Sequence, residues 1–412
     1  MPGIPPDLLE RLRALPAAGP LAGVTGVHVV GGAVRDLAVG ATKPEGAALI
    51  GPLEADFVVE GDAVALVARL GLQVVAVHER FGTATVRVGD TVADLASARR
   101  ERYARPGALP DVELGVSLAE DLERRDFSVN AIAVALDDGR TTAVAGALED
   151  LEAGVLRVLH PASFTDDPTR LLRGARYAAR LDFEYDSETA ALARAAVAGG
   201  ALDRVTPGRL GAELRLLLRE PQPAAIERLG WGGLGRALLG AGFRPDPEYA
   251  SRAVARCPPE TRADLAVLAA SWQGSATEVA ARARELGFTA AELAILEPAA
   301  EVDRTLAALE ADGRSGGSPA VASAGVVDRV LERKPLEVAA LVAAGGVPGA
   351  AAAARRWLEE DRHRRLAITG QDLLAAGLSG PAVGRGLAAA RAAMLDGAAP
   401  GRESQLAAAL GN

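Results

Sequence analysis

The stretch VHVVGGAVRD, residues 27–36, joins a short apolar run to a pair of glycines and then to a helix-forming segment. Its first four residues are typical of a buried strand, and Gly31 and Gly32 stand where that strand would turn into a helix. Glycines at such a turn let backbone N–H groups approach a phosphate, and the helix N-terminus adds a favourable dipole. Two interpretations stay open from this motif alone: a phosphate site, or a turn and nothing more.

A pair of carboxylates opens the next apolar run. Glu54 and Asp56 directly precede FVVEG, and residues two apart on a strand point to the same face. Such a pair is costly unless a cation or solvent compensates it, and magnesium prefers hard oxygen ligands. Asp94, in TVADLA, lies in another strand-like run and is a candidate third ligand. The alternatives are a solvated strand end for the pair and a sheet edge for Asp94.

The chain divides into two parts of different character. Short apolar runs between residues 27 and 96 predict strands, separated at first by helical patterns. From Asp166 onward, segments rich in Ala, Leu, Arg and Glu favour helix. One of them opens with Thr206 as a predicted N-cap and Pro207 at the first helical position. The stretch 312–319, DGRSGGSP, is the best linker candidate.

The composition is that of an ordinary globular protein, with 412 residues of which 49% are hydrophobic and 24% charged. No apolar run approaches the length needed to cross a bilayer, and the N-terminal sequence lacks the pattern of a signal peptide. Cys257 alone provides neither an internal disulfide nor a cysteine-based zinc site. We therefore expect a cytoplasmic protein without membrane attachment.

The charge pattern permits nucleic-acid binding without requiring it. The formal net charge of −9 argues weakly against an RNA-binding surface, but charge distribution matters more than the sum. Arginine, which suits planar phosphate and base contacts, supplies nearly all the positive charge. It clusters in four places: Arg99, Arg100, Arg102 and Arg105; Arg124 and Arg125; Arg170, Arg173, Arg176 and Arg180; and Arg355, Arg356, Arg362, Arg364 and Arg365.

Taken in order, these motifs are much more specific than any one of them. After GGAVRD come FVVEGDA, FGTATV, DLASARRERY, PGALP, EDLERRDFSVNAIA, DDPTRLLRGARYAARLDF and, near the end, ITGQDLLAAGLSGPAVGRGL. The series resembles the class II (bacterial-type) family of tRNA nucleotidyltransferases and poly(A) polymerases. The resemblance is dense over residues 27–216, thins afterwards and returns at 368–397. Chance is a poor explanation for so many motifs in this order.

The resemblance implies an α+β fold. A polymerase-beta-like nucleotidyltransferase head, with a mixed sheet and helices, would occupy residues 1–155. An all-α neck and body would follow over 156–310, and a helical, RNA-binding tail over 320–412. The last arginine cluster, between Arg355 and Arg365, has two interpretations. Its side chains would contact the backbone of the tRNA, or they form a solvated helix face.

The resemblance also implies roles for individual residues. The turn with Gly31, Gly32 and Arg35 would bind the triphosphate. The catalytic metal ligands would be Glu54, Asp56 and Asp94, holding Mg²⁺ at a two-metal site. Contacts to the incoming nucleotide's sugar and phosphates would come from Arg124, Arg125, Asp126, Asn130 and Arg173.

Asp167 and Arg170 match the family's pair that reads the base edge. Spaced i, i+3 on a predicted helix, they would share one face, and would accept from and donate to the Watson–Crick edge of C or A. An ordinary helix ion pair is the alternative. The sequence departs from the family at Glu54, where aspartate is usual; the longer side chain predicts retained activity with altered metal preference.

The activity implied is template-independent addition of CCA, or part of it, to the tRNA acceptor end from CTP and ATP. CC-only or A-only addition and poly(A) tailing share the same motifs and stay open. A catalytically degenerate RNA-binding protein, with Glu54 as the lesion, is an alternative of another class; intact Asp56 and Asp94 argue against it. We expect no membrane and no obligatory protein partner, and the sequence does not predict the oligomeric state.

Overall fold

A computed structural model describes residues 7–40, 56–311 and 322–411. Contacts divide the chain into two compact units. Unit 1 comprises Met1–Glu213 and Gly232–Ala237, and unit 2 comprises Leu214–Trp231 and Leu238–Asn412. Glu54 and the predicted linker at 312–319 lie outside the described residues. The division into head, neck, body and tail stays a prediction.

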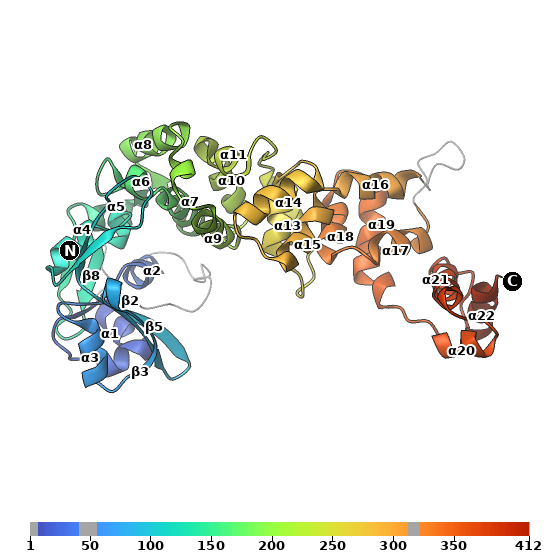
Figure 1. Ribbon diagram of the computed structural model, residues 1–412, viewed down its shortest axis with the longest axis horizontal. Helices are drawn as coiled ribbons and strands as arrows, with labels where there is room; N and C mark the ends of the chain where they lie inside the picture. Colours follow the sequence, from blue (N-terminus) through green and yellow to red (C-terminus); the bar gives the residue numbers. More distant parts are fainter. Residues whose placement is uncertain (1–6, 41–55, 312–321, 412) are drawn as a thin grey trace. The chain divides into compact units, whose positions relative to one another are not determined.

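Unit 1 contains a seven-stranded mixed sheet in the order β3-β4-β5-β2-β1-β8-β9 (Figure 1). Its strands are β1 (Val27–Val30), β2 (Asp56–Val59), β3 (Gln73–His78), β4 (Thr83–Val88), β5 (Thr91–Ser97), β8 (Ile132–Ala135) and β9 (Thr141–Ala143). Only the β2–β5 pair is parallel within this described sheet, and the other neighbours are antiparallel. Two small sheets pair β6 (Arg99–Arg102) with β7 (Asp111–Leu114) and β10 (Val155–Leu156) with β11 (Glu184–Tyr185).

Some helices pack on the sheet, and others follow it along the chain. They are α1 (Leu8–Arg13), α2 (Gly32–Gly40), α3 (Ala63–Arg69), α4 (Leu118–Glu123), α5 (Ala147–Ala153), α6 (Ser163–Asp166), α7 (Thr169–Leu181), α8 (Ser187–Ala198), α9 (Pro207–Leu218) and α11 (Leu234–Leu239). Side-chain caps fix several starts: Asp62 accepts a hydrogen bond from Ala65 N at 3.0 Å, and Ser117 and Glu120 form a capping box before α4. Helix α9 begins at Pro207 as predicted.

The centre of the sheet explains the apolar runs of the sequence. Every residue of β1 is buried, which matches a strand covered on both faces. In β2, Phe57, Val58 and Val59 are buried while Asp56, the first residue, is exposed. The buried part of β2 therefore ends at Asp56, and this exposed end of the strand presents one of the predicted site residues.

In unit 2 the named elements are all helical within the described residues. They are α10 (Ala224–Gly230), α12 (Pro247–Val254), α13 (Ala263–Ser271), α14 (Ala276–Glu285), α15 (Ala290–Ala299), α16 (Val302–Ala311), α17 (Ala324–Leu331), α18 (Leu336–Ala344), α19 (Pro348–Glu359), α20 (Gly370–Ala375), α21 (Pro381–Leu395) and α22 (Arg402–Leu410). Alanine-rich layers close the core of α16–α19 around Trp357. Asp328 accepts from Trp357 Nε1 at 2.8 Å and from Arg391 Nε at 2.6 Å, which ties α17, α19 and α21 together. Throughout the described chain, no helix has the length and apolarity to span a bilayer.

Candidate active site

The GGAVRD motif forms the predicted turn between a strand and a helix. Gly31 follows β1 with φ +65°, a conformation that glycine adopts without steric cost, and Gly32 begins α2. The Gly31 amide donates to Ile132 O at 3.2 Å. A Cβ on Gly31 would lie 3.0 Å from Arg125 Nη1, so the glycine lets a guanidinium approach the turn closely. The turn is confirmed; its phosphate-binding role stays a prediction.

The carboxylates of Asp56 and Asp94 lie on neighbouring strands. The two residues are Cα partners in the parallel β2–β5 register, so both side chains project from the same face of the sheet. Both residues are exposed, and Asp94 Oδ1 accepts a hydrogen bond from Thr85 Oγ1 at 2.6 Å. Strand β5 lies inside the sheet, between β4 and β2. The alternative that places Asp94 at a sheet edge is therefore wrong.

This pair fits a hard divalent cation. The carboxylate oxygens of the two aspartates are the donors that Mg²⁺ prefers. The described part of the chain holds no group of three His, Cys, Asp or Glu side chains arranged as a complete metal site. Glu54, the other member of the predicted Glu54–Asp56 pair, is outside that part. Asp56 and Asp94 thus supply two of the three predicted ligands.

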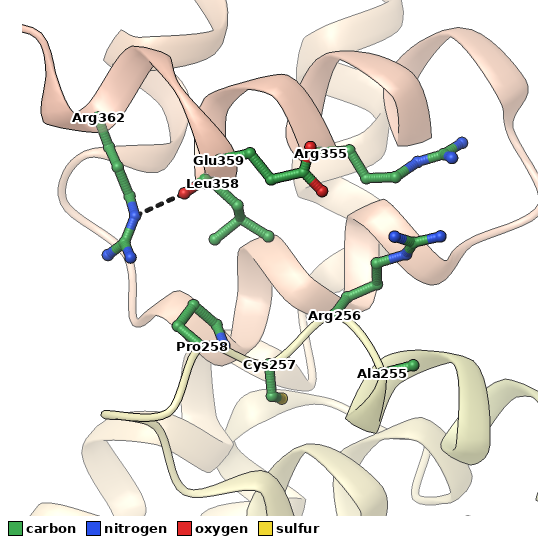
Figure 2. A pocket seen from close by; sticks show the side chains of 8 residues that line it. All are labelled: Ala255, Arg256, Cys257, Pro258, Arg355, Leu358, Glu359 and Arg362. Carbon is green, nitrogen blue, oxygen red and sulfur yellow. Dashed lines mark hydrogen bonds between the residues drawn. The ribbon is translucent and has the colours of Figure 1, made fainter.

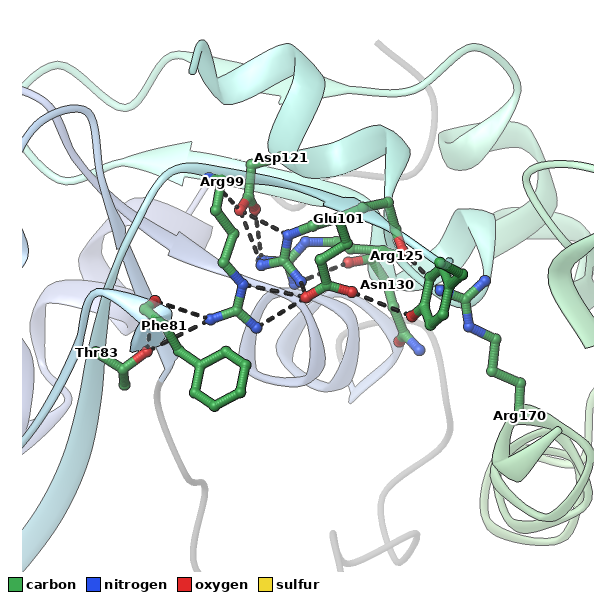
Figure 3. Close-up of polar contacts among 10 residues, drawn as sticks. Phe81, Thr83, Arg99, Glu101, Asp121, Arg125, Asn130 and Arg170 are labelled. Atoms are coloured by element: carbon green, nitrogen blue, oxygen red, sulfur yellow. Dashed lines mark hydrogen bonds and ion pairs between the residues drawn. The ribbon is translucent and has the colours of Figure 1, made fainter. Parts of the chain in front are cut away.

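A buried carboxylate organises the arginines of the RRDFSVN segment (Figure 3). Asp121, on α4, is fully buried. It accepts from Arg124 Nε at 3.0 Å and from Arg125 Nη2 at 3.2 Å. Burial alone would raise the pKa of Asp121, but the two arginines outweigh it and hold that pKa below its ordinary value. Glu101 Oε1 accepts from Arg124 Nη1 at 3.0 Å and from Arg99 Nε at 3.1 Å.

Arg125 retains an unused donor. Its Nε is buried and has no hydrogen-bond partner, while Nη1 donates to Asn130 O at 3.4 Å. Burial is the main reason that the pKa of this guanidinium is lowered, and Asp121 opposes the shift. A buried donor without a partner is unfavourable until an acceptor reaches it. Arg125 is thus equipped to receive an anion beside the Gly31 turn.

Four other predicted residues form one network. Asp126 is buried; its Oδ1 accepts from Asn130 Nδ2 at 2.9 Å and its Oδ2 from Arg173 Nε at 2.8 Å. Asn130 Oδ1 accepts from Arg35 Nη1 at 2.6 Å. Burial would raise the pKa of Asp126, but Arg173 and the Asn130 amide overcome it and hold the pKa far below its usual range. Both oxygens of Asp126 are engaged, so this carboxylate holds Arg173 and Asn130 in place.

Asp167 and Arg170 do not form the predicted helical pair. Asp167 ends α6 in an extended conformation, with φ −130° and ψ 92°, and α7 begins only at Thr169. Asp167 Oδ1 accepts from Thr169 Oγ1 at 2.7 Å and from Arg209 Nη2 at 3.0 Å. Arg170 donates instead to Ser163 Oγ at 2.7 Å and to Arg124 O at 2.8 Å. The prediction of a shared helix face was wrong, because Pro168 disfavours helical geometry in the residue before it.

Several residues that support the site were missed by the sequence analysis. Asp121 had a usable signal, since it precedes Arg124 and Arg125 by three and four positions in a helix-forming segment. Arg209 had none, because it meets Asp167 through the fold. Glu101 and Tyr177 each have one partner nearby in the sequence, Arg99 and Arg173, and meet their other partners through the fold. Tyr177, for example, accepts from Arg173 but also packs beside Arg35, far away in the sequence.

The last arginine cluster lies in unit 2, partly around a pocket of about 210 Å³ (Figure 2). The pocket lies between the end of α12 and α19, and is lined by Ala255, Arg256, Cys257, Pro258, Arg355, Leu358, Glu359 and Arg362. Arg356 pairs with Asp361 at 2.9 Å and Arg362 with Glu260 at 2.9 Å. In the part of the chain that the structure covers, no ion pair involves Arg355, Arg364 or Arg365. These three guanidinium groups keep their charge available to another anion.

Comparisons with known proteins agree with this geometry. A model of the poly(A) polymerase head domain matches residues 27–157. The A-adding tRNA nucleotidyltransferase of Aquifex aeolicus is 44% identical over 199 residues, which cover 47% of this chain and 23% of that relative. The CC-adding tRNA nucleotidyltransferase of Deinococcus radiodurans is 43% identical over 218 residues, or 50% of this chain and 54% of the relative. The chain thus matches about half or less of these curated relatives.

A solved structure extends the similarity to nearly the whole chain. The Thermotoga maritima CCA-adding enzyme, complexed with tRNA, has a TM-score of 0.73 at 26% identity, covering 99% of this chain and 96% of that chain. The mixed sheet, the paired carboxylates and the head-domain match define a nucleotidyltransferase-type head. Residues 27–157 match the poly(A) polymerase head domain, and the chain is similar in sequence and fold to tRNA nucleotidyltransferases, so the predicted resemblance and fold class are confirmed.

Proposed function

We propose that the protein adds CCA, or part of it, to the 3′ ends of tRNA from CTP and ATP without a template. The observation that carries this proposal is the pairing of Asp56 with Asp94 across β2 and β5, beside the Gly31 turn. The names of the similar proteins, which add A, CC or CCA to tRNA, support the choice of substrate.

Asp56 and Asp94 are the described residues that would hold Mg²⁺, and Glu54 would complete the predicted set of ligands. A bound divalent cation would lower the pKa of an attacking 3′-hydroxyl and neutralise charge on the departing pyrophosphate. The protein's part is then mostly positioning and charge stabilisation. The turn at Gly31 and Gly32 would lie against the triphosphate, although the Gly31 amide itself donates to Ile132 O, and Arg125 would offer its Nε, which has no hydrogen-bond partner, to a phosphate oxygen.

Base selection falls to the start of α7. Asp167 and Arg170 come from either side of the α6–α7 junction rather than from one helix face. Each carries a polar group suited to the Watson–Crick edge: the carboxylate accepts from an exocyclic amine, and the guanidinium donates to a ring or carbonyl acceptor. Arg209 and Thr169 hold the Asp167 carboxylate. We propose that this held geometry replaces a nucleic-acid template in choosing C and A.

Unit 2 would hold the RNA by contacts to the sugar–phosphate backbone of the RNA. Arg355, Arg364 and Arg365 are the candidates, because they lack carboxylate partners in the described structure. Contact with phosphates is independent of sequence and weakens as salt concentration rises. This suits an enzyme that must accept many tRNAs with different acceptor stems, which are recognised mainly by shape.

Stepwise incorporation on defined RNA ends tests the proposal. Purified protein with magnesium would receive three tRNA transcripts, ending before CCA, after the first C and after CC. Each transcript would be given labelled CTP, ATP or both, and products would be resolved at single-nucleotide length. Addition of C, C and A followed by a stop is the expected result. Addition of only C residues, or of only the terminal A, would assign one part of that reaction.

Two other outcomes would contradict CCA addition to tRNA. A long ladder of A residues would indicate poly(A) polymerase. No incorporation with magnesium or manganese, while tRNA still binds, would make the chain an RNA-binding protein with a dead site. A Glu54→Asp variant identifies the cause in that last case, since restored turnover would show that Glu54 disables the metal site.

A further inference from the structure

Three arginine side chains meet at one buried tyrosine. The ring centroid of Tyr177, on α7, lies 4.8 Å from Arg35 Cζ, 5.6 Å from Arg173 Cζ and 5.2 Å from Arg176 Cζ. Only 6% of Tyr177 is exposed. A guanidinium within about 6 Å of an aromatic ring is attracted by its quadrupole, more strongly where water is excluded. One ring thus stabilises three cations that would otherwise repel each other.

Tyr177 also closes a circuit of polar contacts through the site. Its hydroxyl accepts from Arg173 Nη2 at 2.8 Å, and Arg173 Nε donates to Asp126 at 2.8 Å. Asp126 accepts from Asn130 at 2.9 Å, and Asn130 accepts from Arg35 at 2.6 Å. Arg35 completes the circuit by lying beside the Tyr177 ring. Every member of this circuit except Tyr177 was predicted above to bind the nucleotide.

The ring itself has a fixed orientation. Phe127 packs against it edge to face, with centroids 5.9 Å apart and an interplanar angle of 89°, which is a preferred geometry for aromatic pairs. Phe127 is fully buried and lies between Asp126 and Asn130 in the chain. Any displacement of the ring would therefore displace the RRDFSVN segment as well.

The arginines depend on the ring to different degrees. Arg35 Nε pairs with Asp36 at 2.7 Å, and Arg173 has Asp126. Among the described residues, the carboxylate recorded for Arg176 is Glu213, at 3.8 Å, and the Nε of Arg176 is buried without a hydrogen-bond partner. The Tyr177 ring, 5.2 Å from Arg176 Cζ, is therefore the second favourable neighbour that the structure records for this guanidinium. Losing the ring should disturb the cluster more than losing the hydroxyl.

We propose that Tyr177 is a positioning residue for the incoming nucleoside triphosphate. Its ring sets the guanidinium of Arg35, just after the glycine turn, and its hydroxyl sets that of Arg173. Tyr177 acts through these two arginines and has no direct contact with the nucleotide. The proposal rests on the proposed function, since it gives both arginines a triphosphate to bind.

Two variants separate the ring from the hydroxyl. Tyr177→Phe removes only the hydroxyl, and Tyr177→Leu removes the ring. Phe164→Leu is the matched control: Phe164 is also buried and packs on the same Phe127 ring at 6.3 Å, but no arginine in the described structure lies over it. All three would be compared with wild type for thermal stability, KM for CTP, KM for tRNA, and CTP affinity without RNA.

The expected result is selective. Tyr177→Leu should raise KM for CTP and weaken CTP binding by roughly tenfold, because it removes cation–π contacts to phosphate-binding groups. KM for tRNA should stay within about twofold of wild type, since the phosphate contacts in unit 2 are unchanged. Tyr177→Phe should weaken CTP binding by only about twofold, because the ring remains. The proposal is overturned if Tyr177→Leu weakens CTP binding no more than Phe164→Leu does.

A double-mutant cycle tests the route through Arg173. If the hydroxyl acts through Arg173, Tyr177→Phe should have no further effect on CTP affinity in an Arg173→Ala background. Additive losses would contradict that route. Failure of the proposed function is visible separately, because wild-type protein would then add no nucleotide to any RNA. CTP binding without RNA still compares the variants in that case, and equal affinities would overturn the proposal.

Discussion

Asp126 shows how single residues in this site combine two kinds of work. Its carboxylate is buried, which alone is unfavourable for a charge, yet Arg173 and Asn130 hold it ionised. A buried charge with its partner in place is tolerated, whereas the same charge without its partner is strongly destabilising. The residue therefore supports the fold of unit 1 while it fixes Arg173, which we propose contacts the nucleotide.

The pH dependence of stability follows from the direction of this shift. The folded-state pKa of Asp126 lies below the unfolded value of about 4, so its contribution is fully present above pH 4 and is lost as pH falls further. We predict a melting temperature that is flat between about pH 5 and 7 and declines below about pH 4. Asp126→Asn should melt lower at pH 7 but decline less steeply in acid. Thermal unfolding across pH 3–7 measures both, and an unchanged acid slope in Asp126→Asn would refute the assignment.

Helix α7 gathers more of the site than any other described element. Arg170, Arg173 and Tyr177 all lie on it, and Gly174 lets it approach the aromatic cluster. A Cβ on Gly174 would lie 2.8 Å from Phe127 Cζ and would also meet the Tyr185 hydroxyl. A glycine inside a helix usually costs stability relative to alanine. Here the close approach is the physical reason for the glycine.

Gly174→Ala should therefore lower stability and nucleotide affinity together. Alanine gains about 1 kcal/mol of helix propensity, but overpacking of a filled core costs about 1–3 kcal/mol. We predict a lower melting temperature and a raised KM for CTP, because α7 must move away from Phe127. Gly384→Ala, on α21 with no neighbour within 4 Å, is the control and should stabilise. A stability gain in Gly174→Ala equal to that of the control would show that the space is not limiting.

Sequence patterns predicted the elements of this site better than its contacts. Local signals sufficed for the β1–α2 turn and for Asp94 on a strand beside Asp56. The prediction that Asp167 lies on the same helix as Arg170 was wrong, because Pro168 disfavours helical geometry in the residue before it. The contact of Asp126 with Arg173 spans 47 positions, and no periodic pattern carries information at that distance. Long-range partners of this kind follow only from the packing of α7 against the segment before β8.

At the scale of the whole molecule, net charge gives a poor account of function. Many arginines are neutralised internally: Arg99 and Arg124 share Glu101, and Arg100 pairs with Glu113. The arginine clusters in the sequence therefore overstate the positive charge available to RNA. The formal net charge of −9 in turn understates the positive charge at particular places on the protein. Arg355, Arg364 and Arg365 keep theirs in unit 2, whereas Arg356 and Arg362 are paired there, and the paired carboxylates belong to unit 1. This separation predicts that catalysis and RNA holding can be lost independently.

The most direct test of the account is nucleotide incorporation by variants of the carboxylate pair. Asp56→Asn and Asp94→Asn would be compared with wild type and with Asp90→Asn, an exposed aspartate in the β4–β5 turn. Incorporation of CTP and ATP into tRNA lacking CCA would be measured alongside tRNA affinity. We predict that both site variants lose at least roughly 100-fold in rate with tRNA affinity unchanged, while Asp90→Asn behaves as wild type. Near wild-type incorporation by Asp56→Asn or Asp94→Asn would contradict the central claim.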